Sequence, residues 1–362
     1  MPAGLQARTA WVACALAVSG CAGAGVYDRA MAEASRDESA GRLADAIAGY
    51  DRAASVASRA RDRDQARWDA ADVMARAKDV AGAVARLDAI ARDDASEHQA
   101  EAAYRAAALR IEHGDADAGW EELERVPRRF PRSGVAHVAV RRLAAHADEA
   151  GPAESARELA ALTRDLSSTE VGQVVAFLAA EHVEASGSDA GARDAYLKIA
   201  DRWPYPFGAF FDDALWKASA LDEKLGRYEA AVSDLERLVS VRETTSLMGS
   251  YERAKYVPAM LRLGELYRDR LHDHARARAA YHRLYTDFDR STKRAEALWL
   301  EAALWREDGE VGKSCDTLAA LVHEFPESRY APCAVARCPA LHATDQASKR
   351  ACPAYVETRD ER

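Results

Sequence analysis

The sequence predicts an all-α protein, a solenoid in which about eight helix–turn–helix repeats follow one another. Turn signals recur at a nearly constant spacing, small residues stand at fixed distances from each turn, and proline follows several of the repeats. The successive spacings are 37, 36, 37, 36, 39, 46 and 37 residues. Such a period indicates helix pairs that bury their apolar faces against their neighbours. The turn positions are Gly41, Lys78, Gly114, Gly151, Gly187, Gly226, His272 and Gly309.

Residues in register with these turns have the sizes that paired helices need. Small residues allow two helices to approach closely, and large residues fill the space between neighbouring pairs. Seven residues before the turn stand Ala34, Ala71, Ala107, Ala144, Ala180, Ser219 and Ala302, and Gly264 lies one residue out of register. Five residues after it stand Ala46, Ala83, Gly119, Ala156, Ala192, Ala231, Ala277 and Ser314. Nine residues after it stand Tyr50, Leu87, Leu123, Ala160, Tyr196, Leu235, Tyr281 and Leu318.

Aromatic residues and prolines complete the pattern. Proline cannot continue a helix, so Pro131, Pro204 and Pro326, each seventeen residues after a turn, end the second helix of their repeats. Aromatic bulk stands ten residues before the turn at Trp68, Tyr104, Phe177, Trp216 and Trp299.

The pattern of two small positions, one large position and a proline at these offsets resembles that of the tetratricopeptide repeat family over roughly residues 24–328. The resemblance implies a right-handed superhelical solenoid over residues 21–330, with a concave face that binds protein segments. Lys78 and His272 stand at turns where glycine is usual, and Ser219 stands where alanine is usual.

The first 20 residues form a separate segment. Arg8 precedes a short apolar run, residues 10–18, which has the anatomy of a secretory signal and is too short to span a bilayer. The sequence Val18-Ser19-Gly20-Cys21 resembles a bacterial lipobox, which implies cleavage before Cys21, a thioether to diacylglycerol, and acylation of the new amine by a fatty acid such as palmitate. By analogy with lipoprotein sorting, Ala22 favours the outer membrane, facing the periplasm. The alternatives are an ordinary signal peptide or a buried helix.

Two stretches are candidates for partner binding. Trp203, Tyr205 and Phe207 lie in the most aromatic stretch, where two prolines prevent a helix. They either pack the corner between two repeats or form an exposed recognition surface. Leu247 and Met248 lie in an insertion that lengthens one spacing to 46 residues, and they form either a loop on the binding face or part of a longer helix.

Residues 331–362 are predicted to form a cysteine-containing cap or tail. Cys315, Cys333, Cys338 and Cys352 remain once the N-terminal cysteines are set aside, and in an exported chain two disulfides are the default. Four cysteines allow three pairings, and we favour Cys315–Cys333 with Cys338–Cys352, because this pins the tail onto the last repeat. A zinc site that uses His342 is the alternative.

The net charge and the sequence motifs indicate which classes of function we do not expect. The formal net charge is −9 and no basic stripe is present, so we expect no nucleic acid partner. We recognise no nucleophile elbow, phosphate loop or zinc-protease motif, and His272, His274 and His282 lack good metal-ligand spacing. The sequence therefore predicts a protein that is not an enzyme, with no cofactor and no metal.

A lipobox followed directly by such repeats resembles the BamD and YbgF class of envelope proteins. This resemblance implies a lipid-anchored scaffold that binds cell-envelope proteins or peptide segments through its helical-repeat groove. The alternative is an accessory of peptidoglycan or polysaccharide handling that binds glycan or recruits its enzymes.

Overall fold

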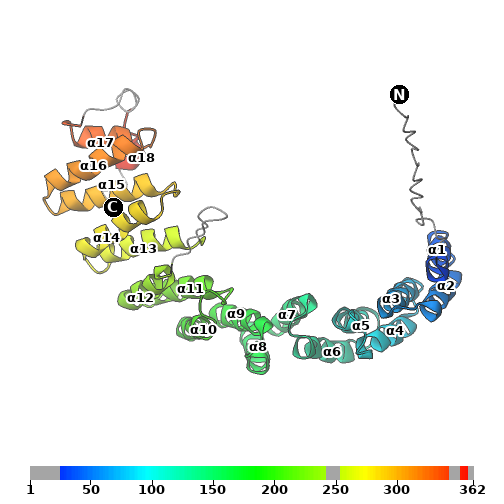
Figure 1. Ribbon diagram of the computed structural model, residues 1–362. Helices are drawn as coiled ribbons and strands as arrows, with labels where there is room; N and C mark the ends of the chain where they lie inside the picture. The colour runs from blue at the N-terminus through cyan, green and yellow to red at the C-terminus, as the bar shows by residue number, and fades with distance from the viewer. Residues whose placement is uncertain (1–24, 242–252, 342–350, 358–362) are drawn as a thin grey trace, which may run out of the picture. The chain divides into compact units, whose positions relative to one another are not determined.

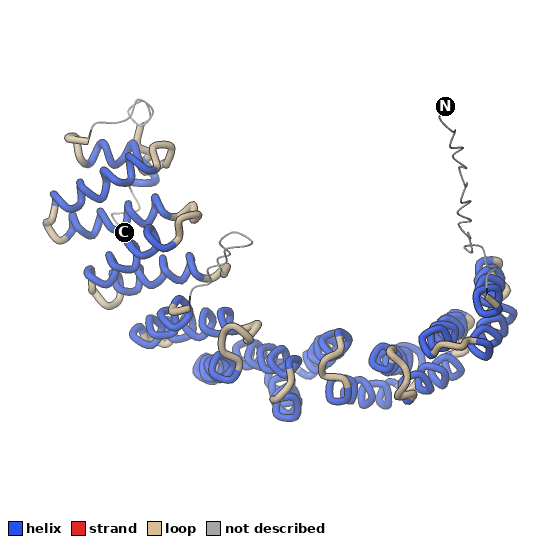
Figure 2. Tube along the Cα trace, in the orientation of Figure 1, coloured by secondary structure: helices blue, strands red, loops and turns tan. Residues whose placement is uncertain are grey.

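The structure is a computed structural model that describes residues 25–241, 253–341 and 351–357. These residues form eighteen α-helices and one short 3₁₀ helix, with no strand, and the predicted all-α repeat fold is confirmed (Figures 1 and 2). No helix in these ranges is both long and apolar enough to cross a membrane. The predicted signal segment, Cys21, Leu247 and Met248 lie outside the described residues.

The chain divides into two compact units, residues 1–139 (unit 1) and 140–362 (unit 2). Unit 1 contains α1 (Val26–Ser39), α2 (Leu43–Val56), α3 (Ala60–Arg76), α4 (Val80–Arg92), α5 (Gln99–His113) and α6 (Ala116–Arg129), and α7 (Gly134–Ala147) crosses the boundary. Unit 2 continues with η1 (Asp148–Ala150), α8 (Pro152–Leu166), α9 (Glu170–Ala185), α10 (Asp189–Arg202), α11 (Phe211–Lys224), α12 (Tyr228–Val239), α13 (Tyr256–Asp269), α14 (His274–Asp287), α15 (Arg294–Glu307), α16 (Val311–Glu324), α17 (Ala331–Arg337) and α18 (Ala354–Glu357).

Left-handed residues make the turns inside most helix pairs. Five glycines adopt positive φ there, as do Lys78 at 67° and His272 at 51°. A left-handed residue after a helix lets the next N–H groups bond to the last carbonyls, which ends the helix. Gly114 is the exception among the predicted turns, with φ of −134°. The second helix that follows is capped by Asp115, whose Oδ1 accepts a hydrogen bond from the Ala118 N–H at 3.1 Å.

The packing follows the predicted register with two local adjustments. Every small residue predicted seven before or five after a turn is buried. At the large position, Ala160 is only half-buried, and its neighbour Leu159 is buried in its place. Gly264 takes the small role in α13, because a Cβ built on it would lie 2.2 Å from Cε1 of Tyr281 on α14. The interhelical contact there requires a residue without a side chain.

Arginines on the second helices bind the end of the preceding second helix. Such a guanidinium satisfies a main-chain carbonyl that the helix leaves unpaired, at the negative end of the helix dipole. We call these contacts arginine clasps. They join Arg129 to Ala91 O at 3.0 Å, Arg202 to Ser167 O at 2.7 Å, Arg237 to Ala200 O at 3.1 Å, and Arg283 to Val239 O at 3.0 Å.

Two disulfides hold the residues that follow the last complete helix pair. They join Cys315 to Cys338 and Cys333 to Cys352, so the pairing we favoured was wrong. The reason is that α17 packs back on α16, which brings the end of α17 rather than its middle beside Cys315. Because all four cysteines form disulfides, their thiols are not available as ligands for the alternative zinc site. His342 lies outside the described residues.

Candidate protein-binding groove

One face of α3 lines two hollows on the layer of first helices. Apart from one adjacent pair at its end, its residues there are spaced by three or four along the sequence, which places them on a single stripe of the helix. They are Gln65, Trp68, Asp72, Ala75 and Arg76.

The facing stripe comes from α5, the first helix of the next pair. It consists of His98, which caps α5, and of Glu101, Arg105, Leu109, Glu112 and His113 within the helix. One hollow, of about 260 Å³, lies where the two helices begin, and the other, of about 370 Å³, lies farther along both. Since the residue numbers advance together on the two helices, the hollows are in line, and we call them the α3–α5 groove.

The length of this groove fits a short protein segment. The lining stripe of α3 runs from residue 65 to residue 76, which is roughly 16 Å at the rise of an α-helix. That span matches about five residues of extended chain or about three turns of helix.

Charges of both signs line the groove. Arg105 reaches towards Asp72 at 3.8 Å, and both side chains are about 40% exposed, at 38% and 41%. Arg76 is held more firmly, because it is bonded to Glu38 on α1. The Tyr50 hydroxyl and then Arg76 hold the pKa of Glu38 below its ordinary value. The Asp72–Arg105 contact is therefore the more easily replaced by groups of a bound segment.

The tryptophan of the groove illustrates a recurring contact that the sequence did not predict. The aromatic residue ten before a turn contacts the residue that caps the next first helix. Ring centroids lie 6.4 Å apart for Trp68 and His98, 4.6 Å for Phe177 and Phe210, and 5.6 Å for Trp299 and Tyr330. In a fourth pair the Lys255 Nζ lies 5.8 Å from the Trp216 ring. The sequence located the first partner of each contact, whereas the second depends on where the next helix begins.

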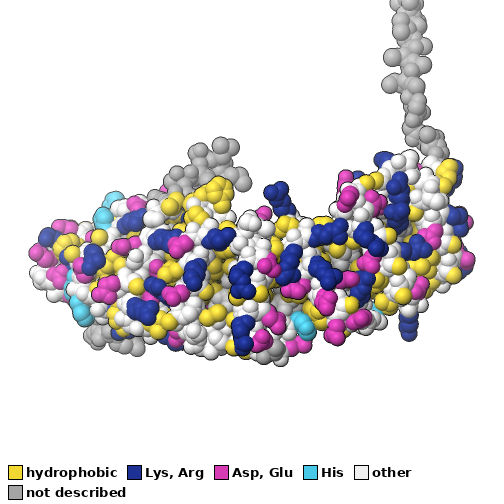
Figure 3. All heavy atoms as spheres, turned by 90° about the horizontal axis from the view of Figure 1, so that it is seen from below, with side chains coloured by type: hydrophobic (Ala, Val, Ile, Leu, Met, Phe, Trp, Pro, Cys, Tyr) yellow, Lys and Arg dark blue, Asp and Glu magenta, His cyan; other side chains and the backbone are white. Residues whose placement is uncertain are grey.

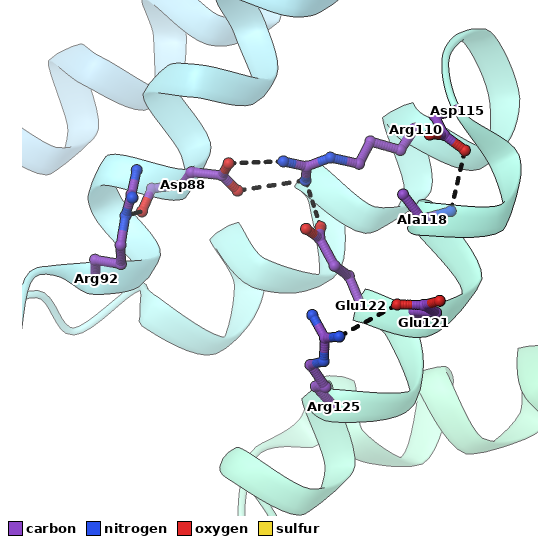
Figure 4. A network of polar contacts seen from close by, with 8 residues as sticks. All are labelled: Asp88, Arg92, Arg110, Asp115, Ala118, Glu121, Glu122 and Arg125. Carbon is purple, nitrogen blue, oxygen red and sulfur yellow. Dashed lines mark hydrogen bonds and ion pairs between the residues drawn. The ribbon is translucent and has the colours of Figure 1, made fainter.

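The opposite layer of unit 1 has a hollow of about 270 Å³ between α4 and α6. Figure 4 shows the network beside it, in which Arg110 bonds to both Asp88 and Glu122. Burial raises the pKa of the Glu122 carboxyl, and Arg110 opposes that effect. Because Arg110 bridges carboxylates from α4 and α6, we interpret this network as a contact that stacks helix pairs.

The predicted aromatic stretch separates into buried and exposed residues. Trp203 and Tyr205 are half-buried against the apolar core of unit 2, and the Arg253 guanidinium lies 4.1 Å from the Tyr205 ring. Phe207 is 86% exposed. Of the two predicted alternatives, packing against the repeats therefore applies to Trp203 and Tyr205, and exposure at the surface applies to Phe207.

The histidines near the last turns pair with carboxylates. His274 lies 2.7 Å from Asp308, and His282 lies 3.0 Å from Glu301. Burial raises the pKa of Glu301. Over the described ranges, no group of three or more His, Cys, Asp or Glu side chains is placed to hold a metal ion. Basic and acidic side chains are interspersed on the face that Figure 3 shows.

Comparison with known proteins finds a family match over one helix pair. Residues 258–291 match the sequence model of the tetratricopeptide repeat family. No curated relative matches the chain. A tetratricopeptide repeat protein from Parabacteroides merdae is 10% identical, with 76% of this chain and 98% of that chain covered and a TM-score of 0.30. The tetratricopeptide domain of P58(IPK) is 16% identical, with 86% and 88% covered and a TM-score of 0.25. The family match thus covers α13 and α14, and the other helix pairs share the turn and packing pattern of this pair.

Proposed function

We propose that this protein is a scaffold that binds segments of other proteins in the α3–α5 groove and performs no reaction of its own. The observation that carries this proposal is the alignment of two hollows beside Trp68 on one layer of unit 1. A half-buried tryptophan among charged side chains is a typical anchor of a protein interface, because aromatic residues supply much of the binding energy.

The groove residues favour binding over catalysis. The two lining stripes contain no serine, threonine or cysteine that could serve as a nucleophile. Their charged side chains are at least partly exposed to solvent. A bound segment would contact Trp68 with an apolar side chain and replace the Asp72–Arg105 contact with its own polar groups.

The experiment is site-specific photo-cross-linking in cells, followed by mass spectrometry. A photoreactive residue at position 75 lies in the groove, and one at position 121, which is exposed on α6, serves as the matched control. We expect one set of proteins to cross-link at position 75, to weaken in a Trp68→Ala background, and not to cross-link at position 121. Identical products from both positions would contradict the groove. A third probe at Phe207 tests whether that exposed ring contributes to the same partner.

We also propose that the protein is anchored through a lipid on Cys21 and faces the periplasm from the outer membrane, where its partners are envelope proteins. The support is the lipobox-like sequence that ends at Cys21 and the Ala22 that follows it. Cys21→Ala is expected to move the protein from the membrane fraction to the soluble fraction and to change its gel mobility. Unchanged fractionation and mobility would reject the anchor.

Binding to peptidoglycan would indicate the alternative function, that of an accessory of peptidoglycan or polysaccharide handling. We expect purified sacculi to leave the full-length protein in solution. Retention on sacculi that is lost in Trp68→Ala would replace the protein partner by a glycan.

A further inference from the structure

In unit 2, Trp299 stands at the repeat position that corresponds to Trp68. A segment of the chain itself covers this tryptophan. Val356, on the short helix α18, is 3% exposed and belongs to one apolar cluster with Trp299 and Tyr330. Charged residues of α13, of α15 and of the connection before α17 surround these rings. We call the whole the Trp299 site, made of Glu265, Arg268, Glu296, Trp299, Arg329 and Tyr330.

The floors of the two sites are built alike. Trp68 and Trp299 each stand ten residues before a turn, and each contacts an aromatic residue that caps the next first helix. The position thirteen before the turn, Gln65 in one site and Glu296 in the other, lines both hollows. The two sites differ in their cover, because only the Trp299 site is lined by residues from outside the helix pairs.

The covering segment has the features of a bound peptide. It is a single helical turn that inserts one aliphatic side chain beside Trp299, while the neighbouring Tyr355 stays 59% exposed. It leaves a space of about 90 Å³ between itself and the charged side chains. An apolar floor with a charged and incompletely filled rim is the anatomy of an interface rather than of a protein interior.

A covalent bond keeps the segment in place. Cys352 lies four residues before Val356 and is joined to the buried Cys333 of α17. A tethered ligand acts at an effective concentration on the order of millimolar, so it outcompetes weak ligands in solution. While the bond is closed, the Trp299 site is therefore unavailable to other chains.

We propose that the Trp299 site is a peptide-binding site that the chain's own residues 353–357 occupy. The external ligand it fits is a protein segment that forms one helical turn and presents an aliphatic side chain next to an aromatic one. This inference rests on the proposed scaffold function, since it extends segment binding from the α3–α5 groove to unit 2.

The test uses a fluorescent peptide of residues 351–362 with Cys352→Ser and the full chain in two forms. The opened form carries Cys333→Ser, Cys352→Ser and Val356→Asp, which remove both the tether and the internal ligand. Fluorescence anisotropy should show binding to the opened form that is at least about tenfold tighter than to the unchanged chain. Peptide carrying Val356→Asp, and an opened form that also carries Trp299→Ala, should both fail to bind.

Equal affinity for the unchanged and the opened chain would overturn the proposal, as would a folded opened chain that does not bind. Should the opened chain not fold, Val356→Asp alone decides by hydrogen exchange. Exchange in residues 294–300 is then expected to accelerate at least about tenfold, with α3 unchanged, and unaltered exchange would reject the internal ligand. Cross-linking at position 75 reports only on the α3–α5 groove, so failure of the scaffold function is measured separately.

Discussion

The sites at Trp68 and Trp299 share one repeat position and differ in what lies above it. Trp68 is half-buried beside a hollow of about 260 Å³, whereas Trp299 is 2% exposed under Tyr330 and Val356. The repeat pattern supplies the aromatic floor in both places. The chain beyond the last complete helix pair determines that one floor is covered, and this difference can be tested by perturbing each site in turn.

The largest expected effect comes from truncating the two tryptophans. Trp299→Ala should lower the free energy of unfolding of unit 2 by about 3–5 kcal/mol, because it empties a packed position. Trp68→Ala should cost about 1–2 kcal/mol in unit 1, since part of that ring already contacts water. Native-state hydrogen exchange in α15 and α3 measures the two losses. Equal losses of unfolding free energy in the two units would mean that the cover over Trp299 adds no stability relative to the open Trp68 site.

The next effect separates the two disulfides. Replacing either pair by serine should destabilise residues 331–357 by about 2–4 kcal/mol, because the two loops, of 23 and 19 residues, are similar in length. Only loss of Cys333–Cys352 should expose the Trp299 site, which exchange in residues 294–300 would report. If loss of Cys315–Cys338 exposed it equally, the segment would not be held by its own tether.

A smaller effect concerns pH in unit 2. Burial, and then the neighbouring Asp222 carboxylate, raise the pKa of Asp234 to about 6, although Arg193 and Arg237 oppose this shift. Its folded-state pKa lies above the unfolded value, so its stabilising contribution is present below about pH 4 and is lost as the pH rises through about 6.

Asp234→Asn should therefore stabilise unit 2 by about 1–3 kcal/mol at pH 7.5 and flatten the dependence of its unfolding between about pH 4 and 7. Urea unfolding at several pH values measures this, with the exposed Asp316→Asn as the matched control. Capture of a partner by the α3–α5 groove should not change. A pH profile like that of the unchanged chain would show that Asp234 does not titrate in this range.

The smallest effect on stability is expected at the Asp72–Arg105 contact. Asp72→Asn should change the free energy of unfolding by less than about 0.5 kcal/mol, because exposed ion pairs contribute little. The same variant should alter cross-linking from position 75, since Asp72 lines the groove. A large loss of stability with unchanged cross-linking would make this contact a structural feature rather than part of a binding surface.

The sequence predicted the repeat because the turns and small residues are local and recur in register. It placed the turn at Gly114 correctly but could not show that this glycine, unlike the other predicted turn residues, has a negative φ, of −134°. It also missed that Leu159, rather than Ala160, is the buried residue. The orientation of α8 about its own axis depends on the helices against which it packs. These departures of a single residue left the fold unchanged.

The candidate sites were harder to predict because they depend on contacts between distant residues. Trp68 was recognised as aromatic bulk, but its partner His98 is defined by where α5 begins. The disulfide pairing depended on the direction of α17 after Pro326, which no local pattern fixes. The aromatic stretch was recognised by composition, yet burial alone separates Phe207 from Tyr205.

The arginine clasps bear on how such an array can change in length. Their acceptor is a main-chain carbonyl, which every kind of residue provides, so only the arginine itself has to be encoded. A contact between two side chains would instead require two matched positions in different repeats. A helix pair that is duplicated, deleted or exchanged together with its arginine can therefore join a new neighbour at once, which makes whole-repeat recombination an accessible route to arrays with new binding faces.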